Sequence, residues 1–110
     1  MDLSLLKDLC KNALLDKKAE NTVVIDISQI SVMADYLIIA SGNNKNQLQA
    51  LADNVIEILH KNNIIQKSIE GYDNANWILI DVGDIIIHIF DKESREFYNL
   101  ERLYQDGKYI

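Results

Sequence analysis

The feature that most constrains the fold is an uninterrupted apolar run from Tyr36 to Ala40. It has the length of a strand and no polar alternation, which is typical of a strand buried on both faces near the centre of a sheet. Ser41-Gly42 breaks the strand, and Asn44 with Gln47 three residues later resembles a capping box that opens a helix. The helix that follows shows one apolar face, made by Leu48, Leu51, Ala52, Val55 and Leu59. A buried strand followed by such a helix predicts an α/β protein.

The remaining elements follow from periodicity and turn residues. An amphipathic helix is predicted over residues 3–17, and a loop over residues 28–35. Strands are predicted at residues 22–27, 36–40, 64–70, 77–81 and 85–90, with a tight turn at 82–84 and a final helix that Asp91 caps. The strand at 64–70 is expected to return parallel through a right-handed crossover. The order α-β-β-α-β-β-β-α predicts one domain over residues 1–110, with a mixed sheet of about five strands and flanking helices.

Charge and composition narrow the classes of function. The chain has 11 basic and 17 acidic residues, a net charge of −6. This balance argues against non-specific nucleic-acid binding, and it suits either a basic protein partner or solubility alone. The single cysteine, Cys10, lies in an apolar helical stripe and is expected in the core. No signal peptide and no apolar run of the roughly 18–20 residues of a membrane helix are visible, so we expect a cytoplasmic protein without a membrane partner.

No constellation of residues predicts catalysis, a metal site or a cofactor. A two-metal site needs at least two converging carboxylates, yet no Asp-x-Asp pair lies on a predicted strand, and Asp81 and Asp84 are interpreted mainly as turn residues. Ser41-Gly42 is at best a weak anion site, because phosphate loops usually need several glycines. His88 stands alone in an apolar strand, on one face with Ile86 and Phe90, which favours a structural or interface role.

Three side chains are candidates for contact with a partner. Trp77 begins a strand after a polar loop and is either an interface anchor or a core residue at the edge of the sheet. Tyr98 in the final helical segment raises the chance that aromatic surface is presented nearby. Arg95 is expected either to pair with an acid such as Asp81 or to point outward to a partner.

Four blocks of sequence together resemble one family. They are Asp35–Gly42, Ala50–Val55, Glu70–Tyr72 with Trp77–Asp84, and Ile87–Phe90 followed by Glu93–Leu103. In this order they are similar to the ribosomal silencing factor family, also called Iojap-like proteins, over nearly the whole chain. The resemblance implies a fold like a nucleotidyltransferase domain that lacks the catalytic carboxylates, and no enzymatic activity.

The resemblance also implies a function. Members of the family bind the large ribosomal subunit through its universal protein number fourteen, block joining of the small subunit and repress translation when nutrients are limiting. Organellar relatives act in ribosome biogenesis, and free members form homodimers. Little direct nucleic-acid contact is expected. By this resemblance the partner-binding residues are Trp77, Ile80, Arg95 and Tyr98, while Asp81 and His88 either touch the partner or support the face.

Two alternatives stay open at this point. The Ser41-Gly42 turn leaves room for a nucleotide-binding enzyme of the nucleotidyltransferase type, whose main weakness is the missing pair of carboxylates. Composition also permits a module for assembly or ribosome biogenesis. Migration with large subunits in a gradient distinguishes a ribosomal role from the others.

Overall fold

The apolar run seen in the sequence is the centre of a mixed sheet. The computed structural model describes residues 1–110, and its six strands lie in the order β3-β4-β5-β2-β1-β6. The strands are β1 (Glu20–Asp26), β2 (Tyr36–Gly42), β3 (Ser68–Glu70), β4 (Trp77–Asp81), β5 (Ile85–Asp91) and β6 (Lys108–Tyr109). Strands β2 and β5 are parallel, and every other neighbouring pair is antiparallel. The predicted domain of a mixed sheet with flanking helices is therefore confirmed.

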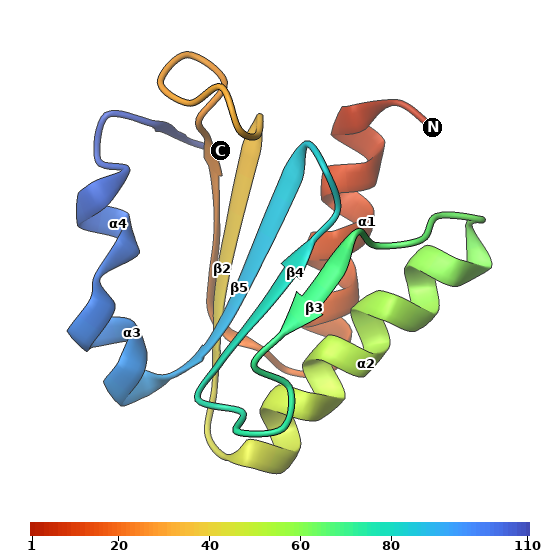
Figure 1. Ribbon diagram of the computed structural model, residues 1–110, viewed down its shortest axis with the longest axis vertical. Coiled ribbons are helices and arrows are strands. Elements are labelled where there is room, and N and C mark those ends of the chain that lie inside the picture. The colour runs from red at the N-terminus through yellow and green to blue at the C-terminus, as the bar shows by residue number, and fades with distance from the viewer.

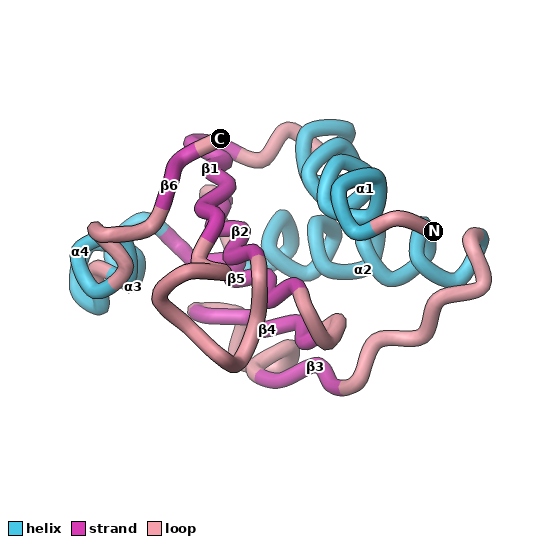
Figure 2. The backbone as a smooth tube through the Cα atoms, turned by 90° about the horizontal axis from the view of Figure 1, so that it is seen from above, coloured by secondary structure: helices cyan, strands magenta, loops and turns pink.

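Helices cover the two faces of this sheet unequally. Helices α1 (Leu3–Asp16) and α2 (Lys45–Lys61) lie side by side on one face, whereas α3 (Lys92–Tyr98) and α4 (Leu100–Leu103) lie on the other, as Figures 1 and 2 show. The larger apolar core, of 17 buried residues, lies beneath α1 and α2, and it includes Cys10 as expected. A cluster of only six buried residues lies on the opposite face. Alternation along β2 divides its side chains between them: Ile38 belongs to the first and Leu37 to the second.

Side-chain caps begin the helices where the sequence predicts them. The Asn44 side chain accepts a hydrogen bond of 2.8 Å from the Gln47 backbone N–H, and Gln47 Oε1 accepts one of 2.7 Å from the Asn43 N–H. The Asp91 carboxylate caps α3 by accepting from the Ser94 N–H at 2.7 Å. These bonds satisfy donors that a helix leaves free in its first turn. They also fix where α2 and α3 leave the parallel strands β2 and β5.

The edges of the sheet differ from the prediction. The segment 64–70 forms only β3, which pairs with β4 at the edge and runs in the same direction as β2 without touching it. The parallel neighbour of β2 is β5, because the turn at 82–84 folds β4 and β5 into a hairpin and β5 takes the place beside β2. The final helix is interrupted at Asn99, whose φ is 48°, and the chain then adds β6 as a sixth strand. None of the helices combines the length and the apolar character that a membrane span requires.

Candidate partner-binding face

One side of β4 and β5 lies beyond the reach of α1 and α2. On β4 the residues Trp77, Leu79 and Asp81 are partly exposed, while the residues between them are buried. The register pairs these three with Phe90, His88 and Ile86 of β5, so all six share one side of the sheet. We call this side of β4 and β5, together with Phe97 and Tyr98 of α3, the Trp77 face. It lies on the side of the sheet that faces α3 in Figure 1.

Aromatic rings connect the core to solvent on this face. The Trp77 ring lies 5.0 Å from the ring of Phe90, which is fully buried, and 4.5 Å from that of Tyr98, which is 50% exposed. The ring of Phe97 meets Tyr98 edge-on at 5.1 Å and is 80% exposed. Exposed aromatic side chains that share a rigid base are typical of binding surfaces, because they contribute area at little cost in conformational entropy. Trp77 thus lies between the core and an exposed apolar surface.

The loop before β4 fixes the position at which Trp77 enters the sheet. Gly71 has a φ of 78°, and a Cβ atom there would lie 2.1 Å from the Trp77 carbonyl oxygen. Only glycine combines this backbone conformation with so close an approach. The buried Ala75 donates its N–H to the Gly71 carbonyl at 2.9 Å, which closes the loop.

His88 lies beneath Trp77 and is nearly inaccessible. It is 7% exposed, and its Nδ1 accepts a hydrogen bond of 2.9 Å from Trp77 Nε1. Because the indole nitrogen can only donate, Nδ1 carries no proton and the neutral ring is protonated at Nε2. Burial lowers the pKa of His88 to about 4, since the cation would be desolvated. The sequence prediction of a hydrogen-bonded His on the face of Ile86 and Phe90 is confirmed.

Arg95 takes neither of the two positions expected from the sequence. Its side chain is 12% exposed, so it does not point outward, and it does not pair with Asp81. Instead Nη1 donates to Ser41 Oγ at 2.8 Å and Nη2 to Glu101 Oε2 at 3.3 Å. The guanidinium thereby joins α3 to the end of β2 and to α4. It holds the helix that presents Tyr98.

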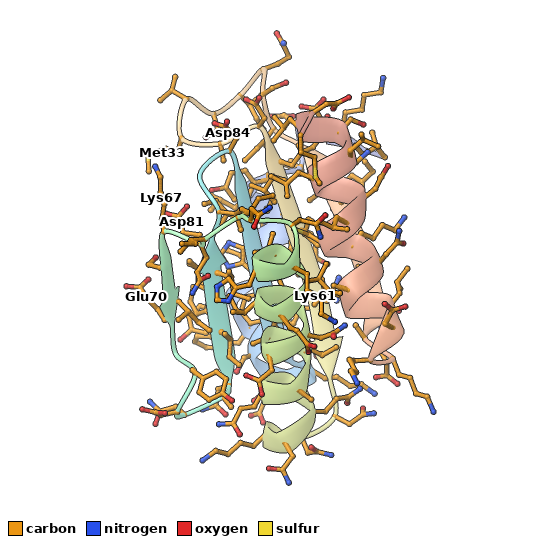
Figure 3. All side chains as sticks on the ribbon, turned by 90° about the vertical axis from the view of Figure 1, so that its right-hand side faces the viewer. Met33, Lys61, Lys67, Glu70, Asp81 and Asp84 are labelled. Carbon is orange, nitrogen blue, oxygen red and sulfur yellow. The ribbon has the colours of Figure 1, made fainter.

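The structure separates Ile80 from the other predicted contact residues. It is fully buried in the larger core, on the side of the sheet opposite Trp77. The expectation that it shares a face with Trp77 is wrong, because side chains one or three residues apart on a strand point to opposite faces. Asp81 does share the side of Trp77, but at the far end of β4, where its Oδ1 accepts from the Gly83 N–H at 2.8 Å. Figure 3 shows Asp81 close to Lys67, at the end of the strand where the hairpin turns.

Sequence reasoning missed two apolar contributions. Leu79 lies two residues from Trp77 on β4, so its side chain points to the same side of the sheet. This alternation could have identified Leu79 in place of Ile80. Phe97 of the last helix was not among the predicted contact residues, yet it is one of the most exposed large apolar side chains. The loop before β2 also exposes Val32 and Met33, and no pattern in the sequence signals this.

The largest hollow of the molecule lies elsewhere. It is an open groove of about 790 Å³ between α2 and β3, lined by Asp53, Ile56, Glu57, His60, Lys61, Gln66, Ile69 and Tyr72. Figure 3 looks onto this side, with Lys61 on α2 and Glu70 on β3. The Tyr72 hydroxyl donates to Asp53 at 2.9 Å, and this bond raises the pKa of the tyrosine. No group of three or more His, Cys, Asp or Glu side chains is placed to hold a metal ion.

Known proteins match this chain in sequence and in fold over nearly the whole of its length. The family model described as "Ribosomal silencing factor during starvation" matches residues 3–110. The chain is 43% identical to the ribosomal silencing factor RsfS of Halalkalibacterium halodurans over 102 residues, which are 93% of this chain and 87% of that protein. It is 29% identical to the mouse protein named "Mitochondrial assembly of ribosomal large subunit protein 1" over 100 residues, 88% of this chain and 44% of that one.

A solved structure agrees with these matches. The crystal structure of a protein from Chromobacterium violaceum superposes with a TM-score of 0.94 at 28% identity, and it covers 96% of this chain and 88% of that one. Sequence and fold therefore lead to the same group of proteins. This chain belongs to the ribosomal silencing factor family.

Proposed function

We propose that this protein silences ribosomes by binding the large subunit through its universal protein number fourteen. Bound there, it occupies the place where the small subunit docks, and so it represses translation when nutrients are limiting. The mechanism is steric and needs neither a cofactor nor turnover, because two bodies cannot occupy one interface. We propose that it acts in the cytoplasm, and that the free protein forms a homodimer.

The observation that carries this proposal is the Trp77 face. Tyr98 and Phe97 are 50% and 80% exposed; Tyr98 packs on Trp77 and on the buried Phe90, and Phe97 packs edge-on against Tyr98. A few aromatic side chains on a rigid base commonly supply most of the energy of a protein interface. Asp81 lies at the rim of this face, and Arg95 and His88 support it from beneath.

Charge adds to the proposal. The net charge of −6 favours a partner surface of opposite sign and disfavours direct contact with ribosomal RNA. Residues Glu93 and Glu96 are exposed on α3 beside the apolar ring of Phe97. Apolar contacts would therefore supply affinity, and the acidic rim would guide the encounter.

A second candidate function is assistance in assembly of the large subunit. The name of the mouse relative states such a role for that protein. Both functions need the same binding step, and they differ in whether mature subunits are blocked. The second is favoured if the protein binds only immature subunits.

A sedimentation gradient tests the proposal directly. Purified large subunits are mixed with the protein, and small subunits are then added. We expect the protein to migrate with the large subunit and the fraction of joined ribosomes to fall. Absence from the large-subunit fractions at micromolar protein would contradict the silencing of mature subunits, while co-migration without loss of joining would favour the role in assembly.

A substitution on the Trp77 face locates the contact. Trp77→Ala is expected to weaken binding to the large subunit by more than ~1 kcal/mol, about fivefold or more in Kd, because it removes the ring that links the core to Tyr98. Ile65→Ala is the control, since Ile65 is an exposed large apolar residue (79%) away from the Trp77 face, in a smaller hollow at the end of α2. Normal binding by a folded Trp77→Ala variant would remove Trp77 from the site.

A further inference from the structure

The contact between Trp77 and His88 joins neighbouring strands diagonally. Trp77 lies opposite Phe90, and His88 lies opposite Leu79, two residues along β5. Diagonal pairs on one face of an antiparallel pair are within reach of aromatic side chains. The two rings lie 5.8 Å apart between centroids, and Trp77 Nε1 donates to His88 Nδ1 at 2.9 Å.

Ring packing alone leaves the orientation of the indole open. The Phe90 ring stacks on the indole at an interplanar angle of 28°, and the Tyr98 ring is tilted by 44° against it. Apolar contacts of this kind have little directionality. The hydrogen bond is directional, and the indole has only one polar atom to satisfy. Because His88 is only 7% exposed, water does not readily replace its Nδ1 as the acceptor for the indole N–H.

We propose that His88 is a positioning residue, which fixes Trp77 in the orientation that the partner meets. This inference rests on the proposed function of the Trp77 face. Ordering a side chain costs conformational entropy, and that cost weakens an interface when it falls on the binding step. The bond to His88 transfers the cost to folding, so that the ring is already ordered in the free protein. His88 then contributes to binding without touching the partner.

Two substitutions separate the hydrogen bond from the packing. His88→Asn keeps an acceptor, because its side-chain oxygen lies near the position of Nδ1. His88→Leu introduces an apolar side chain of similar size that has no acceptor. Because Trp77 is the only tryptophan, its indole N–H gives a single resonance in an NMR spectrum of the ¹⁵N-labelled protein. We expect this proton to exchange with water at least about tenfold faster in His88→Leu than in the native protein, and at an intermediate rate in His88→Asn.

Binding to purified large subunits gives the second readout. We expect His88→Leu to raise Kd about fivefold to tenfold, in line with the net contribution of one hydrogen bond, and His88→Asn to recover part of the loss. In a Trp77→Phe background, which has no donor, the same His88→Leu change should leave Kd unchanged within about twofold. An equal loss in both backgrounds would overturn the proposal, because the effect would then not pass through the indole.

The native protein alone also tests the inference. Rapid exchange of its indole proton would overturn the proposal even if His88→Leu failed to fold. The spectroscopic readout does not involve a partner, so the two proposals fail separately. A protected indole in a protein that does not bind large subunits would contradict the proposed function and leave the positioning of the ring in place.

Discussion

Two buried titratable side chains show how burial sets charge in this protein. Cys10 lies in the larger core, and desolvation raises the pKa of its thiol to about 12. His88 lies under the Trp77 face, and desolvation lowers its pKa to about 4. Both groups are therefore neutral at pH 7, the thiol because it stays protonated and the imidazole because it stays deprotonated at Nδ1. Only the second takes part in a hydrogen bond that protonation would break.

The pKa of His88 predicts that stability falls with acidification. The ordinary pKa is 6.5 and the folded value is about 4, so the unfolded chain binds the proton first as pH falls. The contribution of the neutral His88 to the free energy of unfolding is complete above pH 6.5 and is lost as pH falls from 6.5 to 4. We expect the free energy of unfolding to be about 2 kcal/mol lower at pH 5 than at pH 8 from this group. Urea denaturation across this range measures the change.

His88→Leu is the control for this pH dependence. The variant has no imidazole at position 88, so the loss of stability between pH 6.5 and 5 should nearly disappear. Some carboxylates, among them Asp26 beside Ser28, also have lowered pKa values. Their contribution to stability is lost only at lower pH. A native protein that is equally stable at pH 5 and pH 7.5 would contradict the burial of a neutral His88.

At the scale of elements, α3 is the least supported part of the Trp77 face. It has seven residues, none of them buried, and it ends at Asn99 in the left-handed conformation. Helices this short have little stability of their own. The Asp91 cap holds its start, and Arg95 ties it to Ser41 and Glu101. The presentation of Tyr98 therefore depends on a small number of polar contacts.

Removal of the cap is expected to weaken both α3 and binding. Asp91→Ala should lower the free energy of unfolding by about 1 kcal/mol and raise Kd for large subunits, because Tyr98 would lose its fixed position. Asp2→Ala is the matched control: Asp2 caps α1 by accepting from the Ser4 N–H at 2.7 Å, on the opposite side of the sheet. We expect a similar loss of stability and an unchanged Kd. Equal weakening of binding by both variants would show that general stability decides binding.

Local signals predicted the elements well, and non-local contacts decided the errors. Caps at Asn44 and Asp91 and the turn at 82–84 depend on neighbours in sequence, and all three are found where expected. The pairing of β5 with β2 depends on residues about fifty positions apart, which periodicity does not report. The same holds for Arg95, whose partner Ser41 lies 54 residues away. Ile80 was assigned to the wrong side of β4, and the alternation of side chains along the strand could have prevented this error.

At the scale of the whole molecule, the two sides of the sheet have different roles. Helices α1 and α2 close the larger core on one side, and this core supplies most of the buried apolar residues (Figure 2). The other side is closed only in part by α3 and α4, which leaves the Trp77 face accessible. Stability and recognition are thus carried by opposite faces of one sheet. The whole molecule carries a net charge of −6, and the field of this charge acts at longer range than any contact.

Association with the large subunit should therefore depend on salt and on where charge is changed. We expect the association rate constant to fall about tenfold between roughly 50 and 500 mM salt, while the dissociation rate changes less, because screening weakens steering more than it weakens close apolar contacts. Glu96→Lys on α3 and Asp16→Lys at the end of α1 change the net charge equally, and both side chains are exposed. Glu96→Lys should slow association more, since the charge lies beside the Trp77 face and the other lies across the sheet. Surface plasmon resonance with immobilised large subunits measures both rates. Equal slowing by the two variants would mean that net charge alone guides the encounter, and a rate independent of salt would contradict electrostatic steering.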